Sequence, residues 1–219
     1  MKRFRSLLLI SLLSILPDAI CAQQLQASHS HYSTDDGLCS NAISDIRQDD
    51  LGFLWIATWN GLSRYDGYNF FNYTTGKNSH IPFLHNRIID LQIDNAQNVW
   101  MRMYDGRIFM LNRKTDCIEN PLRSISEYQN LKTQEPITIT STNVIYIIMD
   151  GVGIYELSSD KCGIHPRLIS TGSLHPTCIC EGYRGDLWVG TQQGVHRLNT
   201  TDGTLERNGI LTNESVKCL

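Results

Sequence analysis

The sequence predicts an all-β protein made of repeated four-stranded antiparallel sheets, and three observations lead to this prediction. A tryptophan-centred segment recurs, because residues 54–58 (LWIAT) reappear as residues 187–191 (LWVGT). The anchor positions 55, 100, 145 and 188 are separated by 45, 45 and 43 residues. Between them lie short strand-like runs and turn residues, with no competing helical period. A four-stranded unit that repeats every roughly 40 to 50 residues is typical of a β-propeller blade.

The first repeat shows the four strands most clearly. Its strand-like runs are residues 42–48, 53–58, 62–66 and 69–74. Turns are predicted between them at residues 49–52, 59–61 and 67–68. Asn60-Gly61 and Asp66-Gly67 are pairs that supply the positive φ angles of tight hairpin turns.

Four complete repeats and part of a fifth account for most of the chain. We place them near residues 38–80, 81–124, 125–170, 171–210 and 211–219. The third should be the least regular, because Pro136 lies where its first strand is expected. We therefore predict an incomplete, open propeller of about four blades. Residues 29–34 resemble the fourth strand of the first repeat, and we expect them to supply the outermost strand of the final blade.

The N-terminus has the pattern of a secretory signal peptide. Three cations, Lys2, Arg3 and Arg5, precede an apolar run at residues 7–16 that ends at Pro17. The run is about half the roughly 20 residues that a membrane-spanning helix needs. We predict a signal peptide at residues 1–22 and a mature domain at residues 23–219. A permanent membrane anchor and lipid attachment at Cys21 are the alternatives.

Composition argues against several classes of function. Nineteen basic residues oppose 22 acidic ones, and the net charge of −3 gives no general attraction to nucleic acid. The only close cysteine pair among seven, Cys178 and Cys180, lacks zinc-ribbon spacing. Histidines are scattered, acidic residues fall in turns, and neither a phosphate loop nor a nucleophile elbow is present. We expect no catalytic residues, no metal site and no cofactor.

Residues 37–46 (GLCSNAISDI) and 52–67 (GFLWIATWNGLSRYDG) resemble the two-component regulator propeller repeat. The resemblance extends over residues 28–219 and is strongest in the first and fourth repeats. Ala57 and Arg102 replace a glycine that the family favours. This repeat builds the periplasmic sensors of hybrid two-component systems in gut Bacteroidetes, where a membrane helix joins the sensor to a kinase.

The resemblance implies a non-enzymatic, periplasmic ligand-sensing module, here an N-terminal fragment without the kinase. Its partners would be the remaining sensor blades and a membrane-linked kinase, so a full-length form would be associated with the inner membrane. The implied ligand is an oligosaccharide. The alternatives are a secreted carbohydrate-active propeller enzyme and a non-catalytic protein-interaction scaffold.

One face of the repeats should carry the ligand contacts. Because strands alternate in direction, the loop that enters the first strand and the turn after the second emerge at the same end of each sheet. Trp55, Trp100 and Trp188 recur in strands and should pack between sheets, whereas Trp59 lies in such a turn. Aromatic, amide and carboxylate groups suit sugar binding, although these residues are alternatively ordinary solvated turn residues. The candidate contacts are Trp59, Asn60, His85, Asn86, Tyr104, Asp105, Gln192 and Gln193.

Overall fold

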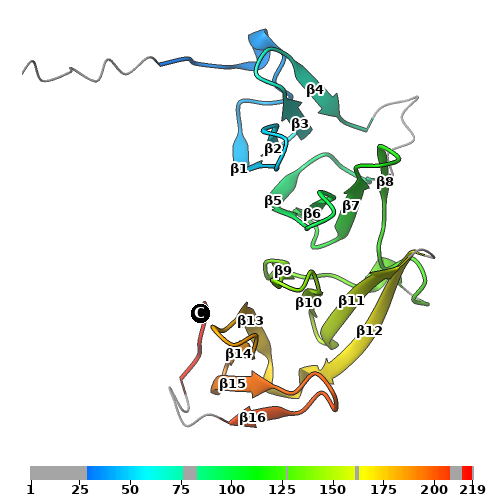
Figure 1. Ribbon diagram of the computed structural model, residues 1–219, viewed down its shortest axis with the longest axis vertical. Coiled ribbons are helices and arrows are strands. Elements are labelled where there is room, and N and C mark those ends of the chain that lie inside the picture. The colour runs from blue at the N-terminus through cyan, green and yellow to red at the C-terminus, as the bar shows by residue number, and fades with distance from the viewer. Residues whose placement is uncertain (1–28, 76–82, 127, 161–162, 208–213, 219) are drawn as a thin grey trace, which may run out of the picture. The chain divides into compact units, whose positions relative to one another are not determined.

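A computed structural model describes residues 29–75, 83–126, 128–160, 163–207 and 214–218. These residues form sixteen strands arranged in four antiparallel sheets (Figure 1). Each sheet contains four strands paired in chain order, as in a propeller blade. The all-β prediction is therefore confirmed. The predicted signal peptide lies outside the described residues.

The strand boundaries follow the repeat. Blade 1 contains β1 (Ile43–Gln48), β2 (Leu54–Thr58), β3 (Gly61–Tyr65) and β4 (Phe70–Tyr73). Blade 2 contains β5 (Ile88–Ile93), β6 (Val99–Met103), β7 (Ile108–Asn112) and β8 (Cys117–Glu119). Blade 3 contains β9 (Thr138–Ile139), β10 (Ile145–Met149), β11 (Gly153–Asp160) and β12 (Gly163–Thr171). Blade 4 contains β13 (Pro176–Glu181), β14 (Leu187–Thr191), β15 (Gly194–Leu198) and β16 (Leu205–Arg207).

Blade 3 departs most from the common pattern, as predicted. Its first strand, β9, has only two residues, whereas β11 and β12 have eight and nine. Pro136 precedes β9 and cannot donate a hydrogen bond to a ladder, which explains the shortened strand.

Three short 3₁₀ turns, η2 (Thr34–Asp36), η3 (Tyr128–Asn130) and η4 (Gly172–Leu174), are the helical elements of the described chain. None of the helices in this part of the chain is long and apolar enough to span a membrane.

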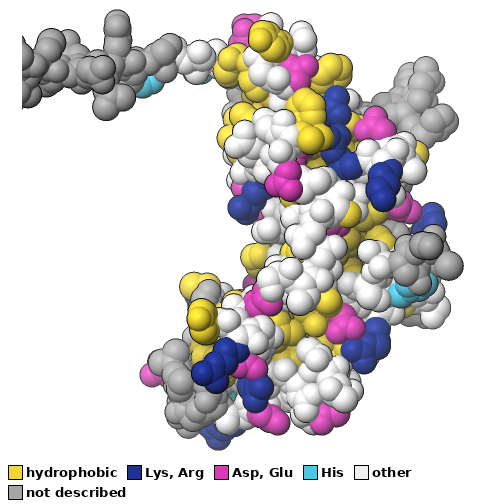
Figure 2. All heavy atoms as spheres, viewed as in Figure 1, with side chains coloured by type: hydrophobic (Ala, Val, Ile, Leu, Met, Phe, Trp, Pro, Cys, Tyr) yellow, Lys and Arg dark blue, Asp and Glu magenta, His cyan; other side chains and the backbone are white. Residues whose placement is uncertain are grey.

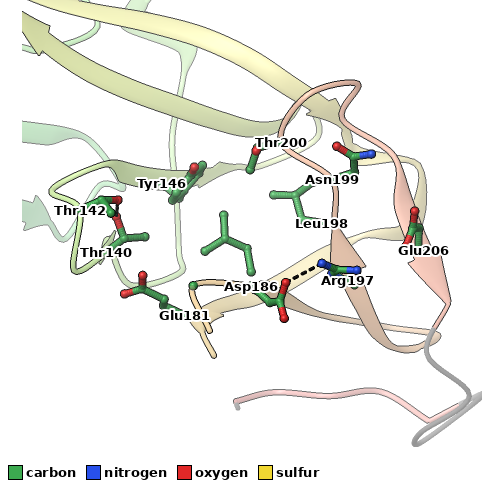
Figure 3. Close-up of a pocket in the computed structure, with 12 residues that line it drawn as sticks. Thr140, Thr142, Tyr146, Glu181, Asp186, Arg197, Leu198, Asn199, Thr200 and Glu206 are labelled. Carbon is green, nitrogen blue, oxygen red and sulfur yellow. Dashed lines mark hydrogen bonds and ion pairs between the residues drawn. The ribbon is translucent and has the colours of Figure 1, made fainter. Parts of the chain in front are cut away.

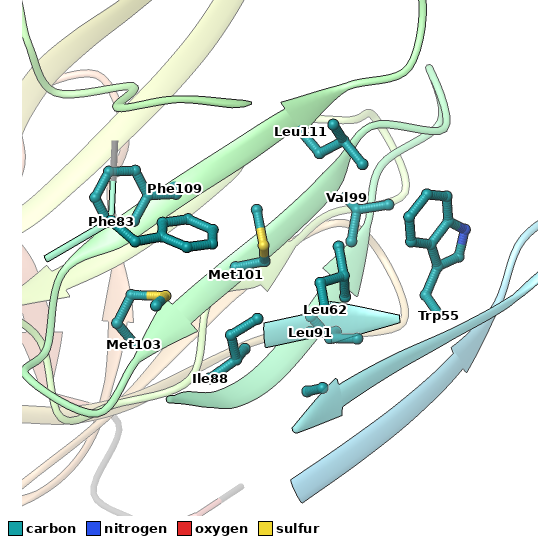
Figure 4. Packing of buried hydrophobic residues seen from close by; sticks show 11 residues of the cluster. Trp55, Leu62, Phe83, Ile88, Leu91, Val99, Met101, Met103, Phe109 and Leu111 are labelled. Atoms are coloured by element: carbon teal, nitrogen blue, oxygen red, sulfur yellow. The ribbon is translucent and has the colours of Figure 1, made fainter. Parts of the chain in front are cut away.

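Three hydrophobic clusters lie between successive blades. The first joins blades 1 and 2, the second joins blades 2 and 3, and the third joins blades 3 and 4. In the first, Trp55 and Leu62 of blade 1 face Val99, Met101 and Leu111 of blade 2 (Figure 4). Each blade thus buries its apolar face against the next, which stabilises sheets that have no closed core of their own.

The anchor tryptophans pack as the repeat suggests, with one correction. Trp55 and Trp100 are buried and belong to the first two clusters, while Trp188 of blade 4 is only partly buried. In blade 3 the equivalent residue is Tyr146, in the third cluster, so the predicted anchor at position 145 is wrong by one. The equivalence follows from the turn bond of Thr140 N to Val144 O.

The same backbone bond closes the corresponding turns of blades 1 and 2. Asp49 N donates to Phe53 O and Asp94 N donates to Asn98 O, and in each case the anchor lies six residues after the donor. Because blade 3 has threonine and tyrosine where the first two blades have aspartate and tryptophan, the sequence pattern alone misplaced it.

The glycine that the family favours is replaced in blades 1 and 2 without disrupting their strands. Ala57 is fully buried in the first cluster. Arg102 forms an ion pair with Asp90 on the neighbouring strand. In blade 4, a Cβ on Gly190 would lie 2.5 Å from Cys178 Sγ and 3.0 Å from Val216 Cγ1. Close packing therefore requires glycine in blade 4.

Residues 29–33 form no regular element. The strand expected at residues 29–34 belongs to the final blade of a complete propeller, so this expectation stays a prediction. Ser33 accepts a hydrogen bond from Asp35 N, and the Asp36 carboxylate accepts one from Ser33 N, so a capped 3₁₀ turn forms at residues 34–36. The Tyr32 ring lies 5.0 Å from that of Tyr65, which belongs to blade 1.

Part of the expected fifth repeat is described. Residues 214–218 form no regular strand, and Val216 N donates to Thr191 O of blade 4 at 3.0 Å. The rest of the segment at 211–219 lies outside the described residues.

Candidate functional site

The turns joining the second and third strands lie beside the residues that precede the first strands. Trp59 N donates to Ala42 O in blade 1, and Tyr104 N donates to Arg87 O in blade 2, both at 3.0 Å. Trp59 and Tyr104 therefore hold equivalent positions, as do Ala42 and Arg87. The shared face expected from strand direction is present in both blades.

Arg87 connects the two aromatic turn residues. Its guanidinium carbon lies 4.0 Å from the ring centroids of both Trp59 and Tyr104. The two rings remain 54% and 58% exposed. We call these three residues the Arg87 stack. It brings one exposed ring from blade 1 and one from blade 2 onto a single cation.

Beside the stack lies a charged group from blade 2. His85 Nε2 is 3.2 Å from Asp105 Oδ2, and Arg107 Nε is 3.6 Å from the same oxygen. The other carboxylate oxygen accepts a hydrogen bond from Arg107 N at 3.1 Å. The Asp105 carboxylate is thus already paired and orders its own turn.

The two asparagines hold the loops together. Asn86 Nδ2 donates to Asn60 Oδ1 at 3.2 Å, which joins blade 2 to blade 1. Asn86 Oδ1 accepts from both the backbone nitrogen and the hydroxyl of Thr75. Asn60 Nδ2 also donates to Cys39 O. Their amides therefore position the stack, and these bonds leave one N–H of each amide for a ligand.

Six of the eight candidate residues meet in blades 1 and 2, and two do not. Gln192 and Gln193 form the equivalent turn of blade 4, where both are exposed. The central residue, Arg87, was missed by the sequence reasoning, which stopped at its neighbour Asn86. The sequence does mark this residue, because Arg87 is the last residue before the first strand of blade 2 and the equivalent residue of blade 1 is the small, uncharged Ala42.

A second kind of feature lies at the opposite ends of the strands. In blade 1, Asp49 Oδ2 accepts a hydrogen bond from Trp55 Nε1 at 2.9 Å. Arg113 of blade 2 lies over the same tryptophan, 4.8 Å from the ring centroid and 3.5 Å from Asp49 Oδ2. The space beside the anchor is therefore filled by an arginine from the next blade.

The next two interfaces lack that arginine and contain hollows instead. The strand registers align Arg113 with Ser159 of blade 3 and Thr200 of blade 4. Ser159 and Trp100 line one cavity of about 430 Å³, and Thr200 and Tyr146 line another of about 430 Å³. Figure 3 shows the second cavity and labels both Tyr146 and Thr200 among the residues that line it.

The polar groups around the second cavity are largely engaged with one another. Asp186 Oδ1 pairs with Arg197 at 2.6 Å (Figure 3). Hydrogen bonds from the backbone and hydroxyl of Ser141 lower the pKa of Glu181. Burial raises the pKa of Tyr146, and the nearby Glu156 carboxylate adds to this shift. The cavity has polar walls, and three of its charged groups, Glu181, Asp186 and Arg197, already have partners.

Figure 2 shows acidic and basic side chains interspersed over the visible face. Within the described ranges, no group of three or more histidine, cysteine, aspartate or glutamate side chains is placed to hold a metal ion. The Arg87 stack is therefore the feature that best distinguishes one face of the described chain from the rest.

Comparison with known proteins identifies the repeat. Residues 37–60 match a family model described as two component regulator propeller. Over 61 residues the chain is 34% identical to Histidine kinase P4 of Formosa agariphila, and the match covers 28% of this chain and 4% of that protein.

Solved structures show the same fold at low sequence identity. The extracellular domain of a hybrid two-component system from B. thetaiotaomicron superimposes with a TM-score of 0.59 and 19% identity, over 82% of this chain and 25% of that one. A virginiamycin B lyase from Staphylococcus aureus superimposes with a TM-score of 0.50 and 17% identity, over 77% of this chain and 56% of that one. The chain thus spans about a quarter of that extracellular domain. Its fold is that of propeller domains, and the resemblance of its first blade to the two-component regulator propeller repeat is confirmed.

Proposed function

We propose that this chain is part of the ligand-sensing region of a hybrid two-component system. In this proposal it is exported by a signal peptide at residues 1–22, binds an oligosaccharide outside the cytoplasm, and catalyses no reaction. The Arg87 stack carries the proposal, because it presents two exposed aromatic rings from neighbouring blades on one face. The matched repeat supports the signalling role.

The chemistry of the stack suits a sugar. Aromatic faces pack against the C–H surfaces of pyranose rings, and an arginine offers several hydrogen-bond donors to hydroxyl groups. Because the loops beneath are joined by the Asn60–Asn86 bond, the rings are held before a ligand arrives. An oligosaccharide spanning Trp59 and Tyr104 would contact two blades and favour one arrangement of them. Such a preference is what a sensor must transmit.

The partners in this proposal are the other sensor blades and a membrane-linked kinase. The chain covers about a quarter of the comparable extracellular domain, so the complete sensing surface would include blades from elsewhere in the longer protein. Likeness to a lyase of the same fold supports no activity here, since unrelated functions occur on shared folds.

Calorimetric titration with a panel of oligosaccharides tests the ligand site. We expect Trp59→Ala and Tyr104→Ala each to weaken binding at least 10-fold, because each removes one stacking face. Tyr68→Ala is the matched control, since Tyr68 is 90% exposed in the turn between β3 and β4, at the other end of the sheet. Unchanged affinity in both variants, or an equal loss in the control, would reject this site.

The export step has a separate test. Mass spectrometry of the native protein should find a mature N-terminus at Gln23. An intact Met1 on membrane-bound protein would show instead that residues 1–22 serve as an anchor.

A further inference from the structure

The charge of Arg87 is uncompensated within the described chain. Its Nε atom is buried and has no hydrogen-bond partner there, and no described carboxylate pairs with the guanidinium. Seven other arginines have a carboxylate oxygen no farther than 3.7 Å away: Arg47, Arg102, Arg107, Arg113, Arg123, Arg167 and Arg197.

Neighbouring acidic groups do not supply the missing partner. Asp105 is the acidic residue in the turns that carry the stack, and its two oxygens already contact His85 and Arg107. Since Arg107 offsets the charge of Asp105, the positive charge of Arg87 remains. The turns that carry the stack therefore have a local excess of positive charge, on a chain whose net charge is −3.

The sandwich also orients the guanidinium. Both ring centroids lie 4.0 Å from its central carbon, so the N–H groups that point away from the rings are left to donate to a ligand. A planar fork of donors matches the two oxygens of a carboxylate or two oxygens of a sulfate ester. Packing against two rings limits its rotamers, which reduces the entropy lost when it binds an anion.

We propose that Arg87 binds an anionic substituent, a carboxylate or a sulfate ester, on an oligosaccharide that stacks on Trp59 and Tyr104. This inference rests on the function proposed above and specifies its ligand class. The aromatic rings provide affinity for the sugar rings, and Arg87 selects acidic saccharides over neutral ones.

Two matched pairs of saccharides separate charge from sugar shape. Galacturonate trimer is compared with its methyl ester, and a sulfated galactobiose is compared with galactobiose. We expect the acidic member of at least one pair to bind 10-fold or more tightly than its neutral partner. The pair that shows the difference identifies the anionic group as carboxylate or sulfate. The preference should shrink at high salt, because screening weakens an exposed ionic contact.

Variants test whether Arg87 causes the preference. Arg87→Gln should bind both members of the pair with the affinity of the neutral one. Arg87→Lys, which keeps the charge but loses the planar fork, should retain only part of the preference. Arg184→Gln is the charge-matched control, since Arg184 is exposed in the turn between β13 and β14, and it should behave as the native protein. Melting temperatures close to the native value establish that each variant is folded.

The outcomes distinguish this inference from the proposed function. Equal binding of acidic and neutral partners would overturn the inference and leave oligosaccharide sensing intact. A preference for acidic partners that persists in Arg87→Gln would also overturn it. Absence of binding by every member of both pairs would overturn the inference as well, while the wider panel with Trp59→Ala and Tyr104→Ala decides the proposed function independently.

Discussion

The interface between blades 1 and 2 and the interface between blades 3 and 4 solve the same packing problem with different residues. At the first, Arg113 fills the space over Trp55 and pairs with the buried Asp49. At the third, Thr200 and Tyr146 occupy the equivalent positions, and a cavity of about 430 Å³ remains. A repeat can therefore keep its strands while losing the large side chains that fill the gap between sheets.

This difference bears on where a ligand binds. The Arg87 stack lies on the filled interface, where its two rings belong to blades that are firmly packed together. A ligand there meets a preorganised surface. The cavity at the third interface results from missing packing groups, and Asp186, Arg197 and Glu181 on its walls already have partners. We therefore propose that a ligand is recognised at the first interface rather than in this cavity.

Removing the anchor aromatic residue should have the largest effect on stability, and the size of the loss should differ between the first and third interfaces. Trp55 is fully buried, so Trp55→Ala should reduce the free energy of unfolding by about 4 kcal/mol. Tyr146→Ala should cost about half as much, because the adjacent cavity already leaves part of that ring without packing. Urea denaturation of both variants measures the difference. Equal losses would mean that the two interfaces are equally well packed.

A glycine at the outer edge of the third interface should matter nearly as much. Gly203, with φ of 75°, lies so close to blade 3 that a Cβ would overlap the carbonyl oxygen of Ile169. Gly203→Ala should cost about 3 kcal/mol, from steric overlap together with backbone strain.

Gly151 is the matched control for Gly203. It has φ of 69° and open space around its Cβ position, so Gly151→Ala should cost only about 1 kcal/mol. Thermal unfolding of both variants compares them. Equal costs would show that blades 3 and 4 are not in close contact at this edge.

Filling the cavity should make the third interface resemble the first. Thr200→Arg places a guanidinium where Arg113 lies in blade 2, within reach of the Tyr146 ring. We expect a gain in stability of up to about 1 kcal/mol from cation–π contact and cavity filling. Oligosaccharide binding at the Arg87 stack should be unchanged. A loss of binding in this variant would assign the ligand to the cavity.

Alkaline pH should weaken the first interface by a smaller amount. Burial, together with a hydrogen bond to Asp116, raises the pKa of Tyr73 from 10.0 to about 12. The folded state therefore holds this proton more tightly, so its contribution to stability is present below pH 10 and is lost as the pH rises towards 12.

Tyr73→Phe should reduce this alkaline loss without removing all of it. The pKa of Tyr65 is also raised to about 12, chiefly by its hydrogen bond to Tyr32, so a second phenol contributes in the same direction. Denaturation midpoints between pH 9 and pH 12 test this point. An identical pH profile in the variant would contradict it.

The sequence was sufficient to predict the features that depend on local pattern. Asn60-Gly61 fixed a hairpin turn and the spacing of the tryptophans fixed the blades, because each signal lies within one repeat. The sequence pattern did not identify Tyr146 as the anchor of blade 3, because this repeat has threonine and tyrosine in place of the aspartate and tryptophan. Contacts and cavities between neighbouring blades were harder to predict from the sequence.

Arg87 illustrates why features between blades are hard to predict from the sequence. Its position before β5 is visible in the sequence, but its role depends on rings contributed by the turns of two blades. The cavities could not be predicted either, since they follow from aligning Arg113 with Thr200 through strand registers that only the structure provides. Trp59 was correctly expected to be exposed, because a turn offers no core for a large ring.

Amide hydrogen exchange, measured with and without the tightest-binding saccharide of the panel, tests the central claim most directly. We expect slower exchange in three stretches, residues 57–61, 84–88 and 103–107, which together form the face that carries the Arg87 stack. Arg87→Gln should reduce this protection, whereas Thr200→Arg should leave it unchanged. Protection confined to residues 181–200, around the cavity between blades 3 and 4, would contradict the account.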